Sequence, residues 1–156
     1  MSADRLLHRW HHALSGDPGV STGFVLADWP VDALGVKSTA WESVVWTGAT
    51  VADSHLRGWL HERGTRFVRE CQFRGEPLTV LLERPPQRAR EPGGAFRVIQ
   101  EWLGEVGCVV EVVQASPGEW KPWVRANPLS RTTKTGNQHE RDALNLLRWW
   151  LATKRG

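Results

Sequence analysis

Apolar and polar residues alternate in three short segments near the N-terminus, and turn-forming residues separate them. The pattern predicts strands over 9–17, 23–29 and 41–46. An Asp-Pro-Gly turn at 17–19 ends the first strand, and Pro30 ends the second. Because the links are short, we expect the three strands to form an antiparallel meander.

The hydrophobic period becomes helical after residue 51, and the rest of the chain alternates helices with strands. The run at 78–82 is entirely apolar, as expected for a central strand buried on both faces. Gly107 is a natural stop for the helix before it. The pattern predicts helices over 51–71, 95–106 and 138–152, strands over 78–82 and 108–113, a loop over 84–94, and a loop with Pro117, Pro122 and Pro128 before the last helix.

The predicted order is therefore β-β-β-α-β-α-β-α. It indicates an α/β domain with a five-stranded mixed sheet and helices on both faces, in which the first and fourth strands are neighbours. A length of 156 residues without an internal repeat indicates one domain over 1–156.

Composition narrows the class of protein. The net charge is only +3, but basic residues outnumber acidic ones from Glu119 onward, which permits nucleic-acid binding. Cys71 and Cys108 fit no ligand spacing and are interpreted as buried thiols of a reducing cytosol. No signal peptide and no apolar run of ~20 residues is present, so we expect a cytoplasmic protein with no membrane partner. The ten Trp residues could stack on bases, but we assign most of them to the core.

Three acidic residues and one histidine lie at the ends of predicted strands or in the first turn of the last predicted helix, where a catalytic or metal site could form. Asp17 ends the first strand and Glu83 ends the buried fourth strand, so the two acids could meet at one sheet edge. His139 and Asp142 are three residues apart and share a face of the last helix. Glu140 would point roughly 100° away from its neighbour His139 on that helix.

Clustered carboxylates repel one another unless a cation neutralises them. Oxygen ligands with one imidazole suit Mg²⁺ or Mn²⁺, and two such ions ~4 Å apart can clamp the attacking and leaving oxygens of a phosphodiester. Each residue also has a simpler interpretation. Asp17 could serve only the turn, Glu83 could pair with Arg84, and His139 and Asp142 could merely favour the helix N-terminus.

Four motifs together resemble the RuvC family of Holliday junction resolvases, within the RNase H-like nucleases. They are DPGVSTGF from Asp17, LLERPP from Leu81, VVEVVQASPGEWK from Val109 and HERDAL from His139. The order of predicted elements also agrees with that family. The resemblance covers most of the chain, from about Leu14 to Ala152.

The resemblance implies an RNase H-like fold and symmetric paired cuts in a four-way DNA junction by a homodimer. It places Asp17, Glu83, His139 and Asp142 as catalytic ligands of two Mg²⁺ or Mn²⁺ ions per active site. It matches Lys121, and less securely Lys134, to basic residues near the scissile phosphate. The helix at 95–106 would be the dimer face. A phage-type member is one possibility, in a bacterial or phage-infected cytoplasm.

Two departures from the family pattern concern DNA contacts. The loop after Glu83 lacks an early aromatic wedge, so junction opening would depend on Arg84, Arg88 and Arg90, or on Phe96. A helix that family members can carry between Lys121 and His139 is expected to be missing. The basic tail, including Arg131, would bind phosphates.

Two other histidine groups have ordinary interpretations. His8, His11 and His12 could form a metal trio, but strand and surface positions explain them better. The HERG motif at 61–64 repeats HERD without its Asp and is expected at the surface.

Two rival functions remain open at this stage. One is a nuclease that cuts flaps and other branched DNA without preferring junctions. The other is a catalytically inactive junction-binding protein. A panel of DNA substrates distinguishes the first rival from a junction resolvase. Metal-dependent cleavage distinguishes a resolvase from the second rival.

Overall fold

The computed structural model describes residues 9–31, 41–84, 94–107, 111–130 and 133–153. Within these ranges the strands are β1 (Arg9–Asp17), β2 (Ser21–Val31), β3 (Val45–Ala52), β4 (Leu78–Glu83) and β5 (Glu111–Ala115). The helical segments are η1 (Trp41–Ser43), η2 (Asp53–His55), α2 (Leu56–Trp59), η3 (Leu60–Gly64), α3 (Thr65–Arg74), α4 (Gly94–Val106), α5 (Pro117–Ala126) and α6 (Gln138–Thr153).

The strands form one mixed sheet in the order β3-β2-β1-β4-β5. β1 and β2, and β2 and β3, pair antiparallel, whereas β4 runs parallel to both β1 and β5. The predicted meander, the five strands and the pairing of the first strand with the fourth are therefore confirmed.

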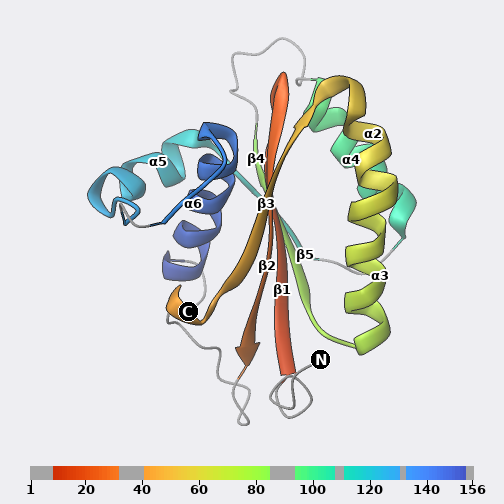
Figure 1. Ribbon diagram of the computed structural model, residues 1–156, viewed down its shortest axis with the longest axis horizontal. Helices are drawn as coiled ribbons and strands as arrows, with labels where there is room; N and C mark the ends of the chain where they lie inside the picture. Colours follow the sequence, from red (N-terminus) through yellow and green to blue (C-terminus); the bar gives the residue numbers. More distant parts are fainter. Residues whose placement is uncertain (1–8, 32–40, 85–93, 108–110, 131–132, 154–156) are drawn as a thin grey trace.

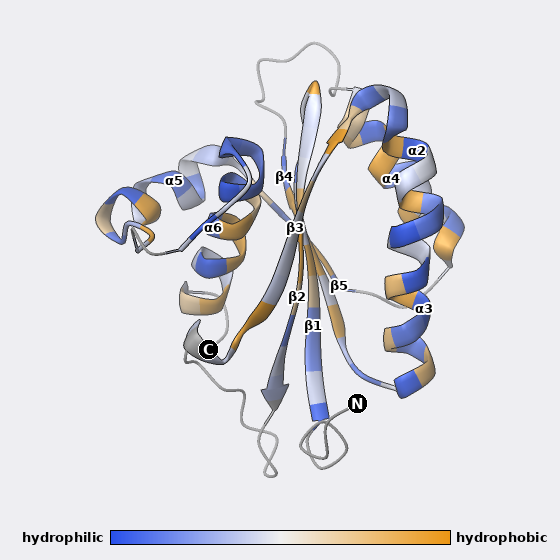
Figure 2. Cartoon of the chain, viewed as in Figure 1, coloured by the Kyte–Doolittle hydropathy of each residue, from blue (hydrophilic) through white to orange (hydrophobic). Residues whose placement is uncertain are grey.

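Helices cover both faces of this sheet (Figure 1). α2, α3 and α4 lie on one face, and α5 and α6 lie on the other. In Figure 2 the apolar positions of α3 and α6 turn toward the sheet and their polar positions turn away. Each face buries its own hydrophobic cluster, so the sheet is held from two sides.

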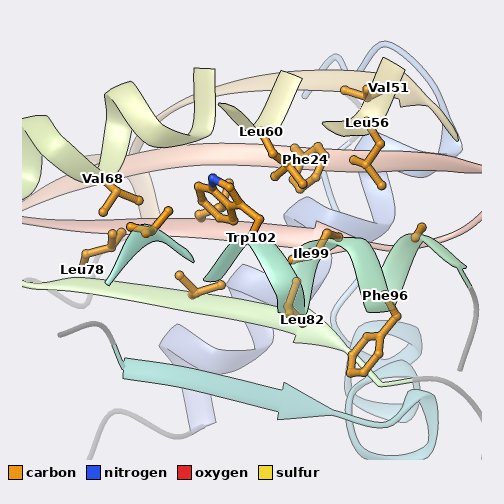
Figure 3. Packing of buried hydrophobic residues seen from close by; sticks show 14 of the residues in the cluster. Phe24, Val51, Leu56, Leu60, Val68, Leu78, Leu82, Phe96, Ile99 and Trp102 are labelled. Carbon is orange, nitrogen blue, oxygen red and sulfur yellow. The ribbon is translucent and has the colours of Figure 1, made fainter. Parts of the chain in front are cut away.

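The core under α2, α3 and α4 is built around Trp102 of α4 (Figure 3). Trp102 lies so close to Gly64 that a methyl group there would overlap the indole ring. Its Nε1 donates a hydrogen bond to Oγ1 of Thr65 at 3.0 Å, which satisfies a polar group inside an apolar cluster. Gly64 and Thr65 thus fix how closely α4 approaches the neighbouring helix.

The core under α5 and α6 is rich in tryptophan. Trp29 of β2 stacks on His11 with ring centroids 4.6 Å apart, and Trp150 of α6 packs beside both. Five of the ten Trp side chains are buried in the two cores, and four more are partly buried and pack against them, which confirms the assignment of most of them to the core.

Arg148 joins α5 to α6. Its guanidinium donates hydrogen bonds to Oδ1 of Asn145 at 2.9 Å and to the carbonyl of Asn127 at 3.0 Å. The same group lies over the ring of Trp123, 5.3 Å from its centroid. Burial lowers the pKa of Arg148. A half-buried cation with these partners holds the end of α5 on α6.

Several sequence predictions of local structure are wrong or shifted. β2 runs through Pro30 to Val31, where Pro30 pairs with Trp10, so Pro30 does not end the second strand. Residues 51–52 belong to β3, so the helix predicted over 51–71 begins after them. Residues 41–43 form a 3₁₀ turn, and the third strand runs over β3 instead of 41–46. The fifth strand is observed at 111–115, and residues 108–110 lie outside the described residues.

The proline-rich segment after β5 was expected to be a loop without a helix, but it contains α5. Pro117 opens that helix, where a missing N–H costs nothing. The carboxylate of Glu119 accepts a hydrogen bond from the N–H of Ser116 at 3.0 Å, one half of a capping box. Trp120 is buried and anchors the helix against the sheet, so packing and capping overcome Pro122 in its interior.

The first turn of α6 lies directly on the sheet. The Ser15 hydroxyl of β1 donates a hydrogen bond to the carbonyl of Ala143 at 2.6 Å, in a buried position. A methyl group on Gly23 of β2 would overlap the backbone carbonyl of His139. Gly23 therefore sets how deeply the N-terminal end of α6 can settle.

We expect Gly23→Ala to destabilise the protein, because the added methyl group has only backbone to displace. Overpacking of this kind costs about 1–3 kcal/mol. Urea denaturation monitored by circular dichroism measures it. Gly104→Ala is the matched control, since a Cβ there meets nothing within 4 Å. Equal stability of the two variants would contradict the close approach.

Candidate active site

Asp17 and Glu83 end two neighbouring parallel strands, so both reach the same edge of the sheet. β1 and β4 run in register up to the pair Gly16 and Leu82, one residue before each acid. Ser15 and Leu81 face the α6 side, and side chains two residues further along a strand share that face. The two carboxyl groups hydrogen-bond to each other.

α6 brings Asp142 to the same place. Asp17 lies opposite Gly23 in the pairing of β1 with β2. The backbone of His139 in turn lies directly against Gly23. One turn further along α6, the carboxyl group of Asp142 hydrogen-bonds to that of Asp17. In Figure 1 the N-terminal end of α6 lies at the same upper end of the sheet as the ends of β1 and β4. We call Asp17, Glu83 and Asp142 the acid cluster.

Asp17 and Asp142 hold their protons unusually tightly. Burial, together with the hydrogen bond and the charge of Glu83, raises the pKa of Asp17 to about 8, against the charges of Lys121 and His139. Burial also raises the pKa of Asp142, and the charge of Asp17 adds to this effect. Carboxylates this close cannot all be ionised unless positive charge is supplied.

Two neighbours oppose this proton affinity. Gln138 donates a hydrogen bond from Nε2 to Oδ1 of Asp142 at 2.7 Å, which lowers the pKa of Asp142. Lys121 of α5 is exposed, and its charge lowers the pKa of both Asp17 and Asp142. The α5 helix, which the sequence analysis missed, therefore places a cation beside the acids.

The donor set fits a hard divalent cation. Among the described residues, no three His, Cys, Asp or Glu side chains form a group ready to hold a metal ion as they stand. Instead Asp17 shares hydrogen bonds with Glu83 and with Asp142, and such pairs require bound protons. Mg²⁺ or Mn²⁺ prefers carboxylate oxygens and could take the place of those protons.

Solved structures with this arrangement of elements exist. The chain is similar to Thermus thermophilus RuvC in complex with a Holliday junction substrate, with a TM-score of 0.58 and 20% identity, over 96% of this chain and 97% of that one. A second Thermus thermophilus RuvC structure matches with a TM-score of 0.53 and 15% identity, over 92% and 97% of the two chains. The chain has the RuvC fold.

That RuvC fold, an RNase H-like mixed sheet between helices, confirms the fold predicted from the sequence. No protein-family model matches the chain, and no curated protein sequence matches it. The likeness is thus one of three-dimensional structure.

Glu140 lies outside the acid cluster, as its helical position predicts. Its carboxylate packs against Gly48 of β3 and against Gly136, where any Cβ would overlap it. Its backbone N–H donates to Oδ1 of Asn137 at 3.1 Å, and the Thr50 hydroxyl donates to the same oxygen at 3.0 Å. Asn137 and Glu140 therefore tie the start of α6 to β3.

The predicted DNA-binding residues have different outcomes. Arg84 is exposed directly after the acid cluster, and its backbone N–H donates to the carbonyl of Ala115 at 2.7 Å. Lys134 is exposed in the segment that precedes α6. Its charge is not among those that shift the pKa values of Asp17 and Asp142. Arg88, Arg90 and Arg131 lie outside the described residues.

Phe96 is ruled out as a junction wedge. Its side chain is only 5% exposed, because it packs into the core under α4 (Figure 3). The suggestion that it opens the junction is therefore wrong.

The N-terminal histidines do not form a metal trio. Nε2 of His11 lies 3.0 Å from Oγ1 of Thr79, whereas Nε2 of His12 lies 2.9 Å from Oε1 of Glu76. As adjacent residues of a strand, the two rings face opposite sides of the sheet. Their structural interpretation is confirmed, and His8 lies outside the described residues.

The predictions about the cysteines, the HERG motif and membrane-spanning segments have the following outcomes. Cys71 is a buried free thiol, and burial raises its pKa to about 12, while Cys108 lies outside the described residues. The first three residues of the HERG motif are exposed, as predicted, and His61 lies 3.6 Å from Glu105, whereas Gly64 is buried against Trp102. Within the described ranges, no helix has the length and apolar character to cross a membrane.

Gln138 and Ser15 are site residues that the sequence analysis missed. Gln138 lies four residues before Asp142, a spacing that places the two on one helix face and could have revealed their hydrogen bond. The role of Ser15 depends on a partner 128 residues away, for which the sequence offers no signal.

We expect Asp17→Asn to stabilise the metal-free protein at alkaline pH. The pKa of Asp17 is higher in the folded chain than its ordinary value of 3.8, so the folded state binds this proton more tightly. The free energy of unfolding of the wild type should then fall as pH rises from about 4 to about 8. The Asn variant lacks this loss and should gain roughly 1–2 kcal/mol at the upper end.

Thermal unfolding in EDTA at pH 5 and pH 8.5 measures this difference. Asp53→Asn is the control, because Asp53 is exposed at the start of η2. A gain for Asp17→Asn that is the same at both pH values would contradict the raised pKa.

Proposed function

We propose that this protein is a metal-dependent endonuclease that resolves four-way DNA junctions by paired strand cuts. The observation that carries the proposal is the meeting of Asp17, Glu83 and Asp142 at one sheet edge of a RuvC fold. A structure of that fold contains a Holliday junction substrate, which supports branched DNA as the substrate class.

The chain's own residues divide the work of phosphodiester hydrolysis. Asp17 is central, because it contacts both other acids, and it would be shared between two Mg²⁺ or Mn²⁺ ions. Glu83 and Asp142 would each complete the ligands of one ion. When bound, the two ions supply a water nucleophile and stabilise the leaving 3′ oxygen.

His139 and Lys121 would act toward the DNA. His139 is exposed at the start of α6 and would ligate an ion or orient the attacking water. Lys121 is exposed and close enough for its charge to act on the acids, so it would meet the negative charge that develops on the scissile phosphate. Arg84 and Lys134, with Arg88, Arg90 and Arg131, would bind flanking phosphates.

Paired cuts require two copies of the chain. Each copy carries one acid cluster, and a four-way junction offers two symmetry-related strands, so a two-fold homodimer would place one site on each. We assign the dimer face to α4. Val98 and Leu103 of α4 are only partly buried against the core, and exposed charged residues lie beside them. Such a protein would act on DNA in the cytoplasm of a bacterial or phage-infected cell.

A cleavage assay on a synthetic four-way junction and a linear duplex tests the activity. We expect paired cuts in the junction alone, with Mg²⁺ or Mn²⁺ and not with EDTA. Asp142→Asn should lose at least about 100-fold in rate, because one ligand of the site is removed. Glu140→Gln is the matched control, since its carboxylate packs away from the acid cluster on the same helix turn.

The alternatives give different results in the same assay. Equal cutting of flaps, forks and junctions would favour a broader branched-DNA nuclease. Tight junction binding without cleavage in any metal would identify an inactive binding protein and overturn the catalytic assignment.

Metal preference tests the role of His139. Because imidazole suits Mn²⁺ better than Mg²⁺, Mn²⁺ should support turnover at least as well as Mg²⁺ at saturation. His139→Asp should shift the preference toward Mg²⁺. Initial rates over a metal titration measure both effects. Faster wild-type turnover in Mg²⁺ would count against His139 as a ligand.

A further inference from the structure

A groove runs along the edge strand β3 beside α2. We call it the β3–α2 groove: it is lined by residues 49–52 of β3 and by Ser54, His55, Gly58, Trp59 and Glu62. Its volume is about 510 Å³, within the range of sites that hold small organic groups. The acid cluster does not contribute to it.

Trp59 forms an aromatic wall of this groove. One face of its indole stacks on Phe24, with ring centroids 4.3 Å apart and ring planes 12° apart. The side chain is partly buried against the core and lines the groove, so part of its surface faces a ligand bound there. A fixed indole with part of its surface exposed can serve as a platform for a stacked nucleobase.

The helix changes its winding at this position. Trp59 is the last residue of α2, and the next five residues, Leu60–Gly64, form the π-helical turn η3. π-turns occur often at functional sites, because they rotate the following side chains away from the regular helical positions. Here the turn carries Glu62 into the groove lining.

The chemistry of the lining fits a base better than a phosphate. Ala49 and Val51 supply apolar surface, while Ser54, His55 and Glu62 supply hydrogen-bonding groups. Among the described residues that line the groove, none is Lys or Arg. A phosphate would lack a cationic partner there, whereas a base needs only a flat apolar wall and polar groups at its edge.

The groove lies within reach of a strand held at the acid cluster. Asp17 pairs with Gly23 across β1 and β2, and Gly23 pairs with Thr50 of β3, which lines the groove. Two strand spacings amount to about 10 Å along the sheet. The acid cluster faces α6 and the groove lies on the α2 face, so a DNA strand would pass around the upper end of the sheet and span a few nucleotides between them. Figure 1 shows α2 beginning at the same upper end of the sheet where β1 ends.

We propose that the β3–α2 groove binds one unpaired base of the DNA substrate, stacked on Trp59, a few nucleotides from the cut. This inference rests on the proposed function, because it takes branched DNA as the ligand. Near a branch point, bases are unpaired at the lowest cost, so a base-capturing groove would favour branched DNA over duplex.

Gly58→Leu tests the groove without disturbing the core. Gly58 lines the groove, and a Cβ there meets nothing within 4 Å, so a leucine would occupy the groove. Replacing a helical glycine also stabilises the helix, which removes misfolding as an explanation. Gly58→Ala is the matched control, with the same backbone effect and little added volume.

Binding is measured by fluorescence anisotropy in EDTA, so that no strand is cut. The probe is a labelled four-way junction with single abasic sites placed one by one within four nucleotides of the branch. We expect Gly58→Leu to weaken binding of the intact junction roughly 5- to 50-fold and Gly58→Ala to weaken it less than about twofold. One abasic position should weaken the wild type similarly and leave Gly58→Leu unchanged.

The outcomes separate this inference from the proposed function. If the wild type binds the junction but Gly58→Leu binds it equally well, the groove does not hold a base and only this inference fails. If Gly58→Leu changes self-association and not DNA affinity, the groove belongs to a protein interface, which also overturns it. If the wild type binds no branched DNA, the proposed function fails as well.

Discussion

The contact between the first turn of α6 and the glycine of β2 determines the geometry of the whole candidate site. Gly23 lets the backbone of His139 approach the sheet to a distance that any side chain would block. The buried hydrogen bond from Ser15 to Ala143 holds the helix there. Because Gly23 also lies opposite Asp17, the same approach brings Asp142 against the strand ends. Asp17 and Asp142 are 125 positions apart in the sequence. Their meeting thus depends on the absence of a side chain at Gly23 and on the hydroxyl group of Ser15.

The acid cluster is unfavourable for the folded chain in the absence of a cation. Burial and mutual repulsion raise the pKa of Asp17 to about 8. Without a cation, Asp17 therefore binds a proton instead of carrying a negative charge at neutral pH. Gln138 and Lys121 partly offset this cost without removing it. The two hydrophobic cores are well packed, whereas the unfavourable charges gather at one place. This combination is typical of a functional site, where chemistry is favoured at some loss of stability.

Sequence patterns predicted most of the fold because hydrophobic period and turn chemistry act locally. The apolar run at 78–82 and the turn at 17–19 located β4 and the end of β1, and therefore the edge where the acids meet. The failures have physical causes. α5 was missed because three prolines outweighed the Ser116 and Glu119 cap and the buried Trp120. Phe96 was misassigned because its position after a loop gave no sign that it packs inward. The roles of Ser15 and Gly23 depend on tertiary contacts that no local pattern encodes.

Arg148 gives the two helices on this face a shared behaviour. By binding the end of α5 through Asn127 and Trp123, it makes α5 and α6 one packed unit that carries both Lys121 and Asp142. The Ser15 hydrogen bond and the close approach at Gly23 hold this unit on the sheet. A cation and an acid from two different helices are therefore positioned against Asp17 by a single packing arrangement, so a change in how α5 meets α6 would alter the charge balance of the site.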